Sequence, residues 1–266
     1  MPMARLKDIT IHYELQGHGE PLLLIMGYRG SGFMWGEELL GLLASAFQVI
    51  TFDNRGTGLS DKPDIAYTMA TMADDAAGLL THLGLARAHV FGVSMGGMVA
   101  QELALRYPRQ VKRLMLGCTS CGGPQATLAA PEVFLQFLAP PGVPRDEAVR
   151  RQWPVLFSPG FVATQQPFLE HLTARALAYP TPSHTAYRQM LAMQRFTTYG
   201  RLGQITASTL VLTGDQDILV PPANALLLAE KIPRASLHII ADAGHGFFWE
   251  SPRAVCALLR DFCALP

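Results

Sequence analysis

One serine in this chain stands in a setting that could make it chemically reactive. Ser94 follows an apolar, β-branched run that predicts a buried strand, and a helical pattern begins directly after it. A residue at so sharp a turn usually needs a positive φ and small neighbours, and Gly92 and Gly96 meet that need. The pattern Gly-x-Ser-x-Gly therefore predicts a nucleophilic serine whose hydroxyl lies at the positive end of a helix. The plainer alternative is a Gly/Ser turn that only joins a strand to a helix.

A serine hydroxyl is inert near neutral pH unless a base accepts its proton, and a histidine held by a carboxylate is the usual base. His245 is the strongest candidate of the eight histidines, because glycines flank it in a loop directly after the last expected strand. His12, His89 and His238 fall inside expected strands, where a core or sheet-surface role is more common.

Three aspartates could hold that histidine. Asp215 and Asp217 both follow the strand expected at 208–213, and their spacing alone does not separate them. The structural role open to Asp215 is to bind backbone amides of its own turn. Asp53 also ends a strand, but the Asn-Arg-Gly that follows it favours a structural turn network.

The negative charge that develops on a carbonyl oxygen during nucleophilic attack needs N–H donors. The backbone N–H of Met95 is available at the start of the helix that follows Ser94. A glycine-rich dinucleotide motif is excluded, because Gly27, Gly30 and Gly32 have the wrong spacing and no acidic residue follows in register.

The elements expected to position these residues alternate between strand and helix. After an opening strand at 6–13, strands are expected at 21–26, at 47–53, in the run that contains His89 and ends before Ser94, and at 111–118, 208–213 and 236–240. This alternation predicts right-handed crossovers and a mainly parallel, doubly wound α/β sheet. Ligands gather at the carboxyl ends of such strands, where Gly27, Asp53 and Ser94 are expected to lie.

The region 122–203 breaks this alternation. It has no strand-like run, and its short helical patterns are separated by Pro124, Pro140, Pro141, Pro154, Pro159, Pro167 and Pro180. Many aromatic and aliphatic residues give the region apolar surface that it must bury. We therefore predict an inserted helical cap at 122–203 that lies over the strand ends, with 1–121 and 204–266 forming the core domain.

Composition limits the class of function. The 266 residues include 21 basic and 21 acidic side chains without a long basic run, which argues against nucleic acid or an anionic membrane as partner. The start of the chain has no apolar core of signal-peptide length, and the longest apolar run is too short to cross a bilayer. We expect a cytoplasmic protein that acts on a small molecule, as a monomer or a homodimer.

Cys118 and Cys121 have the spacing of a redox motif or of half a zinc site. No second cysteine pair or nearby histidine pair completes a metal site, so incidental thiols at the end of a strand are expected.

The order Ser–acid–His, together with four motifs, resembles the α/β-hydrolase fold superfamily in its serine-nucleophile branch of esterases and enol-lactonases. The motifs are Gly-Val-Ser-Met-Gly at 92–96, Asp-Asn-Arg-Gly-Thr-Gly at 53–58, Asp-Ile-Leu-Val-Pro at 217–221 and Gly-His at 244–245. They extend over nearly the whole chain outside the predicted cap, so the resemblance implies this fold with an inserted helical lobe.

The resemblance also implies roles that the pattern alone leaves open. It makes Asp217 the triad acid, and it assigns the second oxyanion donor to the backbone N–H of Tyr28, with the N–H of Met95 as the first. Family members commonly begin the loop before that donor with His-Gly, whereas this chain has Met26 in place of the histidine. The amide donor is unaffected by this change, but the hydrogen bonds that usually support the loop are put in question.

The resulting expectation is a hydrolase of carboxylic esters or lactones of small apolar substrates. It would act through an acyl-enzyme formed by the triad Ser94, Asp217 and His245, with no metal or organic cofactor. A cofactor-free perhydrolase or haloperoxidase could use the same triad. A carbon–carbon bond hydrolase would also need a cap arginine such as Arg188 or Arg195. A non-turnover receptor of this fold is the remaining alternative.

Overall fold

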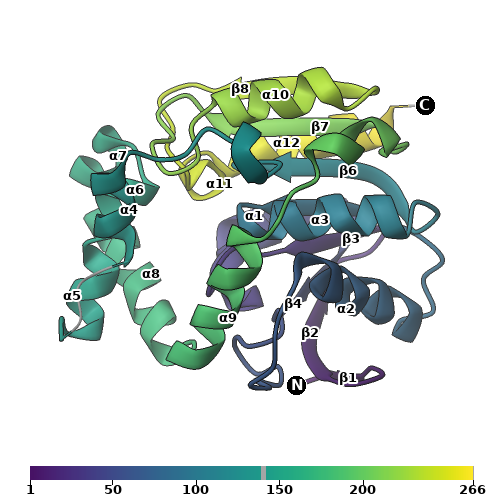
Figure 1. The fold of residues 1–266 in the computed structure, drawn as a ribbon, viewed down its shortest axis with the longest axis horizontal. Helices are drawn as coiled ribbons and strands as arrows, with labels where there is room; N and C mark the ends of the chain where they lie inside the picture. Colours follow the sequence, from purple (N-terminus) through teal and green to yellow (C-terminus); the bar gives the residue numbers. More distant parts are fainter. Residues whose placement is uncertain (139–141, 266) are drawn as a thin grey trace.

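The computed structural model describes residues 1–138 and 142–265. In this part of the chain, eight strands form one sheet in the order β1-β2-β4-β3-β5-β6-β7-β8 (Figure 1). The strands are β1 (Met3–Arg5), β2 (Thr10–Gln16), β3 (Glu20–Ile25), β4 (Phe47–Phe52), β5 (Ala88–Val93), β6 (Val111–Gly117), β7 (Thr209–Gly214) and β8 (Ala235–Ile240). All strands from β3 to β8 pair in parallel, while β1 and β2 are antiparallel at one edge. The predicted mainly parallel α/β sheet is confirmed.

The single opening strand expected at 6–13 is wrong, because two strands form there. The N–H of Leu6 donates to the carbonyl of Ile9 at 2.9 Å and closes a turn, after which β1 and β2 pair with Ala4 opposite Ile11. Apolar residues continue through the turn, so their alternation in the sequence hides it.

Helices cover both faces of the sheet. In chain order, α-helices and 3-10 helices (η) are η1 (Gly32–Trp35), α1 (Glu37–Ala44), α2 (Met69–His82), α3 (Met95–Arg106), η2 (Gly123–Gln125), α4 (Pro131–Leu138), α5 (Arg145–Arg150), α6 (Trp153–Leu156), α7 (Pro159–Thr164), α8 (Gln166–Ala178), α9 (Ser183–Gln194), η3 (Tyr199–Gln204), α10 (Ala223–Lys231), α11 (Phe247–Glu250) and α12 (Pro252–Ala264). α2, α3 and α10 pack on one face, and α1 and α12 pack on the other. No helix in the described part of the chain is both long and apolar enough to span a membrane.

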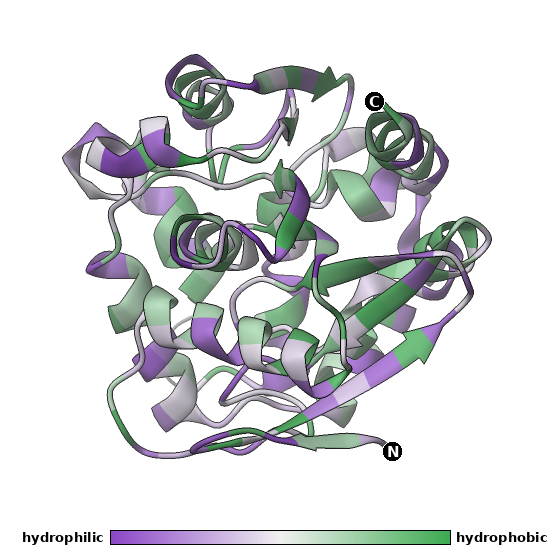
Figure 2. Cartoon of the chain, turned by 90° about the vertical axis from the view of Figure 1, so that its right-hand side faces the viewer, coloured by the Kyte–Doolittle hydropathy of each residue, from purple (hydrophilic) through white to green (hydrophobic). Residues whose placement is uncertain are grey.

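The sheet divides the core into two, because successive side chains of a strand point to opposite faces. In β3, Leu23 and Ile25 pack in the cluster beneath α2, α3 and α10, whereas Leu22 and Leu24 pack in the cluster beneath α1 and α12. All four side chains are fully buried. Figure 2 shows green apolar segments along the interior strands, while the surrounding helices carry both colours. This two-sided burial fixes the strand ends on which the site depends.

Local sequence sets several helix ends. At the start of α2, the Thr68 hydroxyl accepts from the N–H of Thr71 at 3.0 Å, and the Thr71 hydroxyl accepts from the N–H of Thr68 at 3.0 Å. This reciprocal capping box makes Thr68 the N-cap residue of α2. After α2, Gly84 adopts a φ of 71°, a conformation that suits glycine at a helix end. Pro252 opens α12 at a position where its missing N–H costs nothing.

Helices α4 to α9 form an insertion between β6 and β7, and Figure 1 shows α4 to α8 to one side of the sheet. In the described part of 122–203 no strand forms, and an isolated bridge joins Gly122 to Thr197. The insertion has a small apolar core of its own, made of Trp153, Phe157, Leu169 and Leu172. The expected proline breaks at 140 and 141, and position 266 of the predicted core domain, lie outside the described residues. The boundaries of a cap domain at 122–203 stay a prediction.

Candidate functional site

Ser94 occupies a tight turn between β5 and α3. Its φ of 54° lies in the left-handed region, as predicted, and its N–H donates to the carbonyl of Gly117 at 2.9 Å. A Cβ at Gly92 would clash with the carbonyl oxygen of Gly96, and a Cβ at Gly96 would clash with that of Ile25. Close backbone approach therefore requires both glycines, and it lets α3 begin directly beside β3.

His245 and Asp217 form a buried pair at the ends of neighbouring strands. His245 lies in the loop between β8 and α11, and its Nδ1 is 2.9 Å from Oδ2 of Asp217, which follows β7. The other carboxylate oxygen accepts from the N–H groups of Leu219 at 3.0 Å and Val220 at 2.8 Å. The carboxylate is thus fixed by its own loop, and it orients the imidazole through Nδ1.

Burial and charge act in opposite directions on this imidazole. Desolvation lowers the pKa of His245, but the Asp217 carboxylate raises it, and the resulting pKa lies well above the usual value for histidine. The buried thiol of Cys118 is close enough to interact with the imidazole, and burial raises the pKa of that thiol. The ring is therefore a strengthened base that lies beside a protonated thiol.

The other two candidate acids bind backbone amides. Asp53 accepts from the N–H of Gly32 through one oxygen and from the N–H of Leu59 through the other, both at 2.7 Å. Asp215 accepts from the N–H of Ala243 at 3.3 Å. Both aspartates thus have the structural roles that the sequence left open to them.

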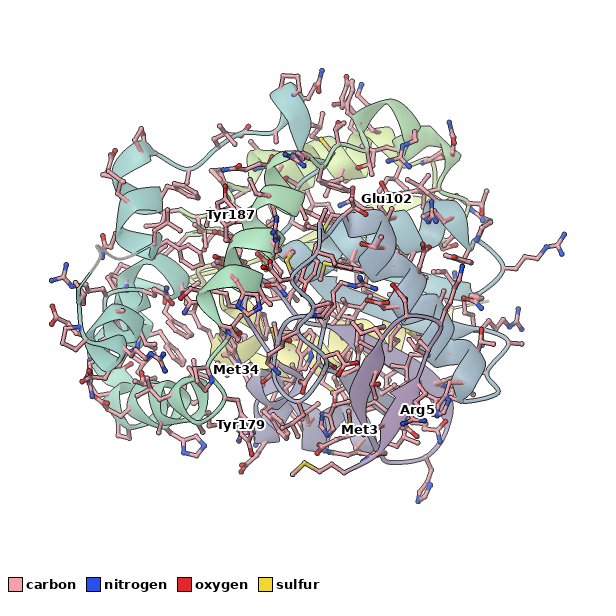
Figure 3. The ribbon with its side chains drawn as sticks, turned by 60° about the horizontal axis from the view of Figure 1, so that its bottom comes forward. Met3, Arg5, Met34, Glu102, Tyr179 and Tyr187 are labelled. Carbon is pink, nitrogen blue, oxygen red and sulfur yellow. The ribbon has the colours of Figure 1, made fainter. Side chains whose placement is uncertain are left out.

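A cavity of about 350 Å³ lies between the carboxyl edge of the sheet and the inserted helices. Ser94 and His245 both line it, together with Tyr28 from the loop after β3. Met34 and Tyr179, two further lining residues, are labelled in Figure 3 where the first part of the chain meets the inserted helices. The wall is rich in apolar side chains, among them Phe137, Trp153, Leu156, Phe157, Leu172, Phe248 and Trp249.

The cap arginines considered for carbon–carbon bond hydrolysis lie elsewhere. Arg188 pairs with Asp64 at 3.0 Å, and Arg195 lines a different, smaller hollow. Neither belongs to the lining of the cavity that holds Ser94, whereas Arg29 and two other arginines of the inserted region, Arg145 and Arg175, do.

Two backbone amides flank Ser94. Met95 is the first residue of α3, and its side chain is fully buried in the core, so its backbone alone can act at the site. Tyr28 follows Gly27, where a Cβ would lie 3.1 Å from the Cβ of Ser94, so this loop passes close to the serine. Within the described residues, no protein group accepts a hydrogen bond from either N–H.

Glu250, at the end of α11, is a further residue of the site, and no sequence motif pointed to it. Its carboxylate accepts from the N–H of Gly244 at 2.8 Å and from the hydroxyl of Ser158 at 2.5 Å. Burial raises the pKa of Glu250, although these hydrogen bonds oppose the shift. The N–H of Gly246 also donates to the carbonyl of Leu156 at 2.6 Å. These hydrogen bonds connect the loop between β8 and α11 to the inserted region. The sequence feature that could have indicated this role is an acidic residue directly after the aromatic residues of α11.

The four cysteines are free thiols, and all of them are buried. Nowhere in residues 1–138 and 142–265 do three or more His, Cys, Asp or Glu side chains gather in a way that could hold a metal ion.

Comparisons with known proteins agree with this architecture. Residues 20–252 match the family described as alpha/beta hydrolase fold. The putative carbamate hydrolase RutD of Azorhizobium caulinodans is 31% identical over 263 residues, which cover 99% of this chain and 98% of that protein. A poly(3-hydroxyalkanoate) depolymerase of Ectopseudomonas oleovorans is 32% identical over 249 residues, which cover 92% of this chain and 84% of that protein.

A solved structure supports the same relationship. Est816, described as an N-acyl homoserine lactone degrading enzyme, matches with a TM-score of 0.81 at 28% identity and covers 98% of this chain and 100% of that one. The family match spans the three strand ends that carry Ser94, Asp217 and His245. The chain therefore belongs to the alpha/beta hydrolase fold family, and the hydrolases among its relatives make it an enzyme of that type.

Proposed function

We propose that this protein is a serine hydrolase that cleaves carboxylic esters or lactones of small apolar molecules. The observation that carries the proposal is one cavity wall shared by Ser94 and His245, with the imidazole hydrogen-bonded to the buried Asp217 at 2.9 Å. The relatives support this class of substrate, since one is a poly(3-hydroxyalkanoate) depolymerase and another degrades an N-acyl homoserine lactone.

In the proposed first half-reaction, Nε2 of His245 accepts the hydroxyl proton of Ser94 as the serine oxygen attacks the substrate carbonyl carbon. The N–H groups of Tyr28 and Met95 donate to the carbonyl oxygen as it becomes negative. The imidazolium then returns the proton to the leaving alkoxide oxygen. The bond between the carbonyl carbon and that oxygen breaks, which leaves an acyl-enzyme and a free alcohol.

In the second half-reaction, water attacks the acyl carbon while His245 accepts one water proton. That proton passes to the oxygen of Ser94 as the ester bond of the acyl-enzyme breaks, so the acid is released and the serine is restored. Throughout, Asp217 keeps the proton of the neutral ring on Nδ1 and stabilises the imidazolium that forms transiently.

The cavity favours a short to medium apolar acyl group. Its volume of about 350 Å³ is near the lower end of the range for ligand pockets, about 300–1,000 Å³. Burial of one methylene group contributes about 0.8 kcal/mol, or roughly a fourfold change in rate. We therefore expect kcat/KM to rise about fourfold with each added methylene until the acyl chain fills the cavity.

The test combines intact-protein mass after exposure to a fluorophosphonate with hydrolysis of p-nitrophenyl esters from C2 to C12. The wild-type protein should gain one adduct that maps to Ser94, and it should turn over many esters per enzyme. Ser94→Ala should abolish both the adduct and turnover with an unchanged melting temperature. Ser120→Ala is the control, because Ser120 is a buried serine three residues after the end of β6, and it should keep both. An adduct that persists in Ser94→Ala contradicts the proposed nucleophile.

Carbamate esters belong in the same panel because of the match to RutD. A second arm adds hydrogen peroxide and a carboxylic acid. Labelling of Ser94 with turnover in that arm alone would replace the ester hydrolase by a perhydrolase. Labelling without turnover in any arm would favour a ligand receptor.

A further inference from the structure

The loop after β3 is held by groups from two other parts of the chain. The side-chain amide of Asn54 donates to the carbonyl of Met26 at 2.9 Å. The hydroxyl of Thr181 donates to the carbonyl of Arg29 at 2.8 Å, and the N–H of Arg29 donates to Oε1 of Gln189 at 3.0 Å. These bonds support the loop in a chain that has methionine where histidine is common.

Arg29 is the strained residue of this loop. Its φ of 60° lies in the left-handed region, which costs a non-glycine residue about 1 kcal/mol or more. Such a conformation persists only where the surroundings hold it, and both peptide groups of Arg29 are bonded to Thr181 and Gln189 of the insertion. The backbone next to Tyr28 is therefore shaped by the inserted helices.

Gln189 is well suited to this role. It lies on α9 with no exposed surface, its Oε1 accepts from the N–H of Arg29, and its Nε2 donates to the carbonyl of Arg55 at 3.0 Å. Since one partner is a donor and the other an acceptor, the side-chain amide has a single satisfied orientation. Arg29 and Arg55 follow β3 and β4, which are neighbouring parallel strands. Gln189 thus connects two strand ends to one inserted helix.

We propose that Gln189 is a positioning residue for the oxyanion-binding amide of Tyr28. The inference rests on the proposed function, because only acyl transfer places a negative oxygen beside that amide. Gln189 does not line the cavity and so acts through Arg29 without touching substrate. A misplacement of about 1 Å in a catalytic group costs roughly 10²-fold in rate, which sets the scale of the expected effect.

The main variant is Gln189→Met, whose side chain has a similar length and cannot hydrogen-bond the two backbone groups. We expect kcat for a p-nitrophenyl ester to fall about 10- to 100-fold while KM stays within about twofold. The inhibition constant of a trifluoromethyl ketone that carries the same acyl group should rise by the factor by which kcat/KM falls. This ketone forms an anionic adduct with serine, so its affinity reports the oxyanion site.

Thr185→Val is the matched control. Thr185 is a fully buried residue of the same helix, and its hydroxyl donates at 2.8 Å to the carbonyl of Gly56, next to the Arg55 carbonyl that Gln189 binds. Its loss should lower the melting temperature in a similar way but leave kcat and the ketone affinity within about twofold, since it does not touch the loop of Tyr28.

Gln189→Glu supplies a rescue that a purely structural role does not predict. A protonated glutamic acid has one donor and one acceptor, as glutamine has here, whereas the carboxylate cannot donate to Arg55. Burial raises the pKa of such a carboxyl, so protonation is within reach of mildly acidic buffers. The ratio of kcat for Gln189→Glu to kcat for the wild type should therefore rise toward one as pH falls. The protonation of His245 lowers kcat in both proteins alike, so the ratio removes this shared effect of pH.

The outcomes separate the two levels of the argument. A wild-type protein without adduct or turnover would overturn the proposed function and this inference with it. If the wild-type protein turns over esters but Gln189→Met does not change kcat and ketone affinity, the inference alone is overturned. The same holds if Gln189→Met changes both quantities only as much as Thr185→Val does. The inference is supported if kcat and the affinity for the ketone fall by similar factors in Gln189→Met and stay unchanged in Thr185→Val.

Discussion

Asp215 and Asp217 are two residues apart in the same loop, yet only Asp217 hydrogen-bonds the buried imidazole of His245, at 2.9 Å. Asp215 instead accepts from the N–H of Ala243 at 3.3 Å. The difference arises because the chain turns between the two aspartates and points their carboxylates in different directions. The two side chains should therefore respond differently to the same substitution.

Asp217→Asn should lower kcat/KM for esters by about 10⁴-fold, because an amide no longer enforces the correct imidazole tautomer. Asp215→Asn is the control and should leave kcat/KM within about threefold while it lowers stability by about 1 kcal/mol through its weakened bond to the loop. Steady-state kinetics and thermal melts on both variants measure these effects. If Asp215→Asn is the slower enzyme, the assignment of the acid is wrong.

The pKa of His245 predicts the direction of the pH dependence. The Asp217 carboxylate raises that pKa well above its usual value, although burial opposes the shift. Because only the neutral imidazole can accept the serine proton, kcat/KM should fall as pH drops through this raised pKa, with a midpoint above about 6.5. In Asp217→Asn the residual activity should show a midpoint at lower pH. A pH–rate profile with a midpoint that is unchanged or higher in the variant contradicts this account.

At the scale of elements, the strand-turn-helix unit of β5 and α3 depends on glycines that let backbones touch. Gly92→Ala would place a methyl group against the carbonyl oxygen of Gly96, so the turn must shift. We expect a loss of about 1–3 kcal/mol in the free energy of unfolding, measured by denaturant titration, and a loss of ester hydrolysis. Gly41→Ala is the control, since α1 leaves open space at Gly41. It should stabilise the protein by about 0.5–1 kcal/mol, and the reverse order of the two effects would refute the packing argument.

The inserted helices line the cavity and also hold two of its loops. They contact the loop of His245 through Glu250 and the loop of Tyr28 through Gln189, so both sides of the cavity depend on one insertion. Since Ser158 is the N-cap residue of α7 and Gln189 lies on α9, the two connections can be tested separately.

At the scale of the whole molecule, a buried ion pair joins the loop after β4 to α2. Arg55 donates to both carboxylate oxygens of Asp75, at 2.6 and 2.7 Å, and both side chains are nearly inaccessible to solvent. Desolvation raises the pKa of Asp75, although Arg55 opposes the shift. The same arginine supplies the carbonyl that Gln189 binds, so the pair also supports the region of the site.

Asp75→Ala should therefore destabilise the protein by about 3–5 kcal/mol, because it leaves a buried guanidinium with only the exposed carboxylate of Asp8, at 3.9 Å, as an ionic partner. Asp74→Ala is a neighbouring control. Asp74 pairs with Arg106 at 2.8 Å on the surface, where such a pair contributes only about 0–1 kcal/mol. Urea denaturation of both variants measures the difference, and equal losses would show that burial does not govern the strength of the Arg55 pair.

Much of this molecule follows from short stretches of sequence. The positive φ at Ser94 and the two glycines beside it form one local unit, so five residues suffice to predict it. The alternation of strands and helices likewise predicts a parallel sheet, because each buried strand is a continuous apolar run. The resemblance to a known family then names Asp217, and that carboxylate is the one that the structure brings to His245.

Only the tertiary structure reveals the supports of the site. The backbone of Arg29 meets Gln189 across 160 positions of the chain, and Ser158 meets Glu250 across 92. In contacts of this kind, a side chain binds a backbone group or a hydroxyl. Because nearly every residue has such backbone groups, these contacts produce no recognisable pattern of residue types in the sequence. Local sequence determined which groups could react, because strain and close approach depend on immediate neighbours. The packing of the insertion against the strand ends decided which groups hold them in place.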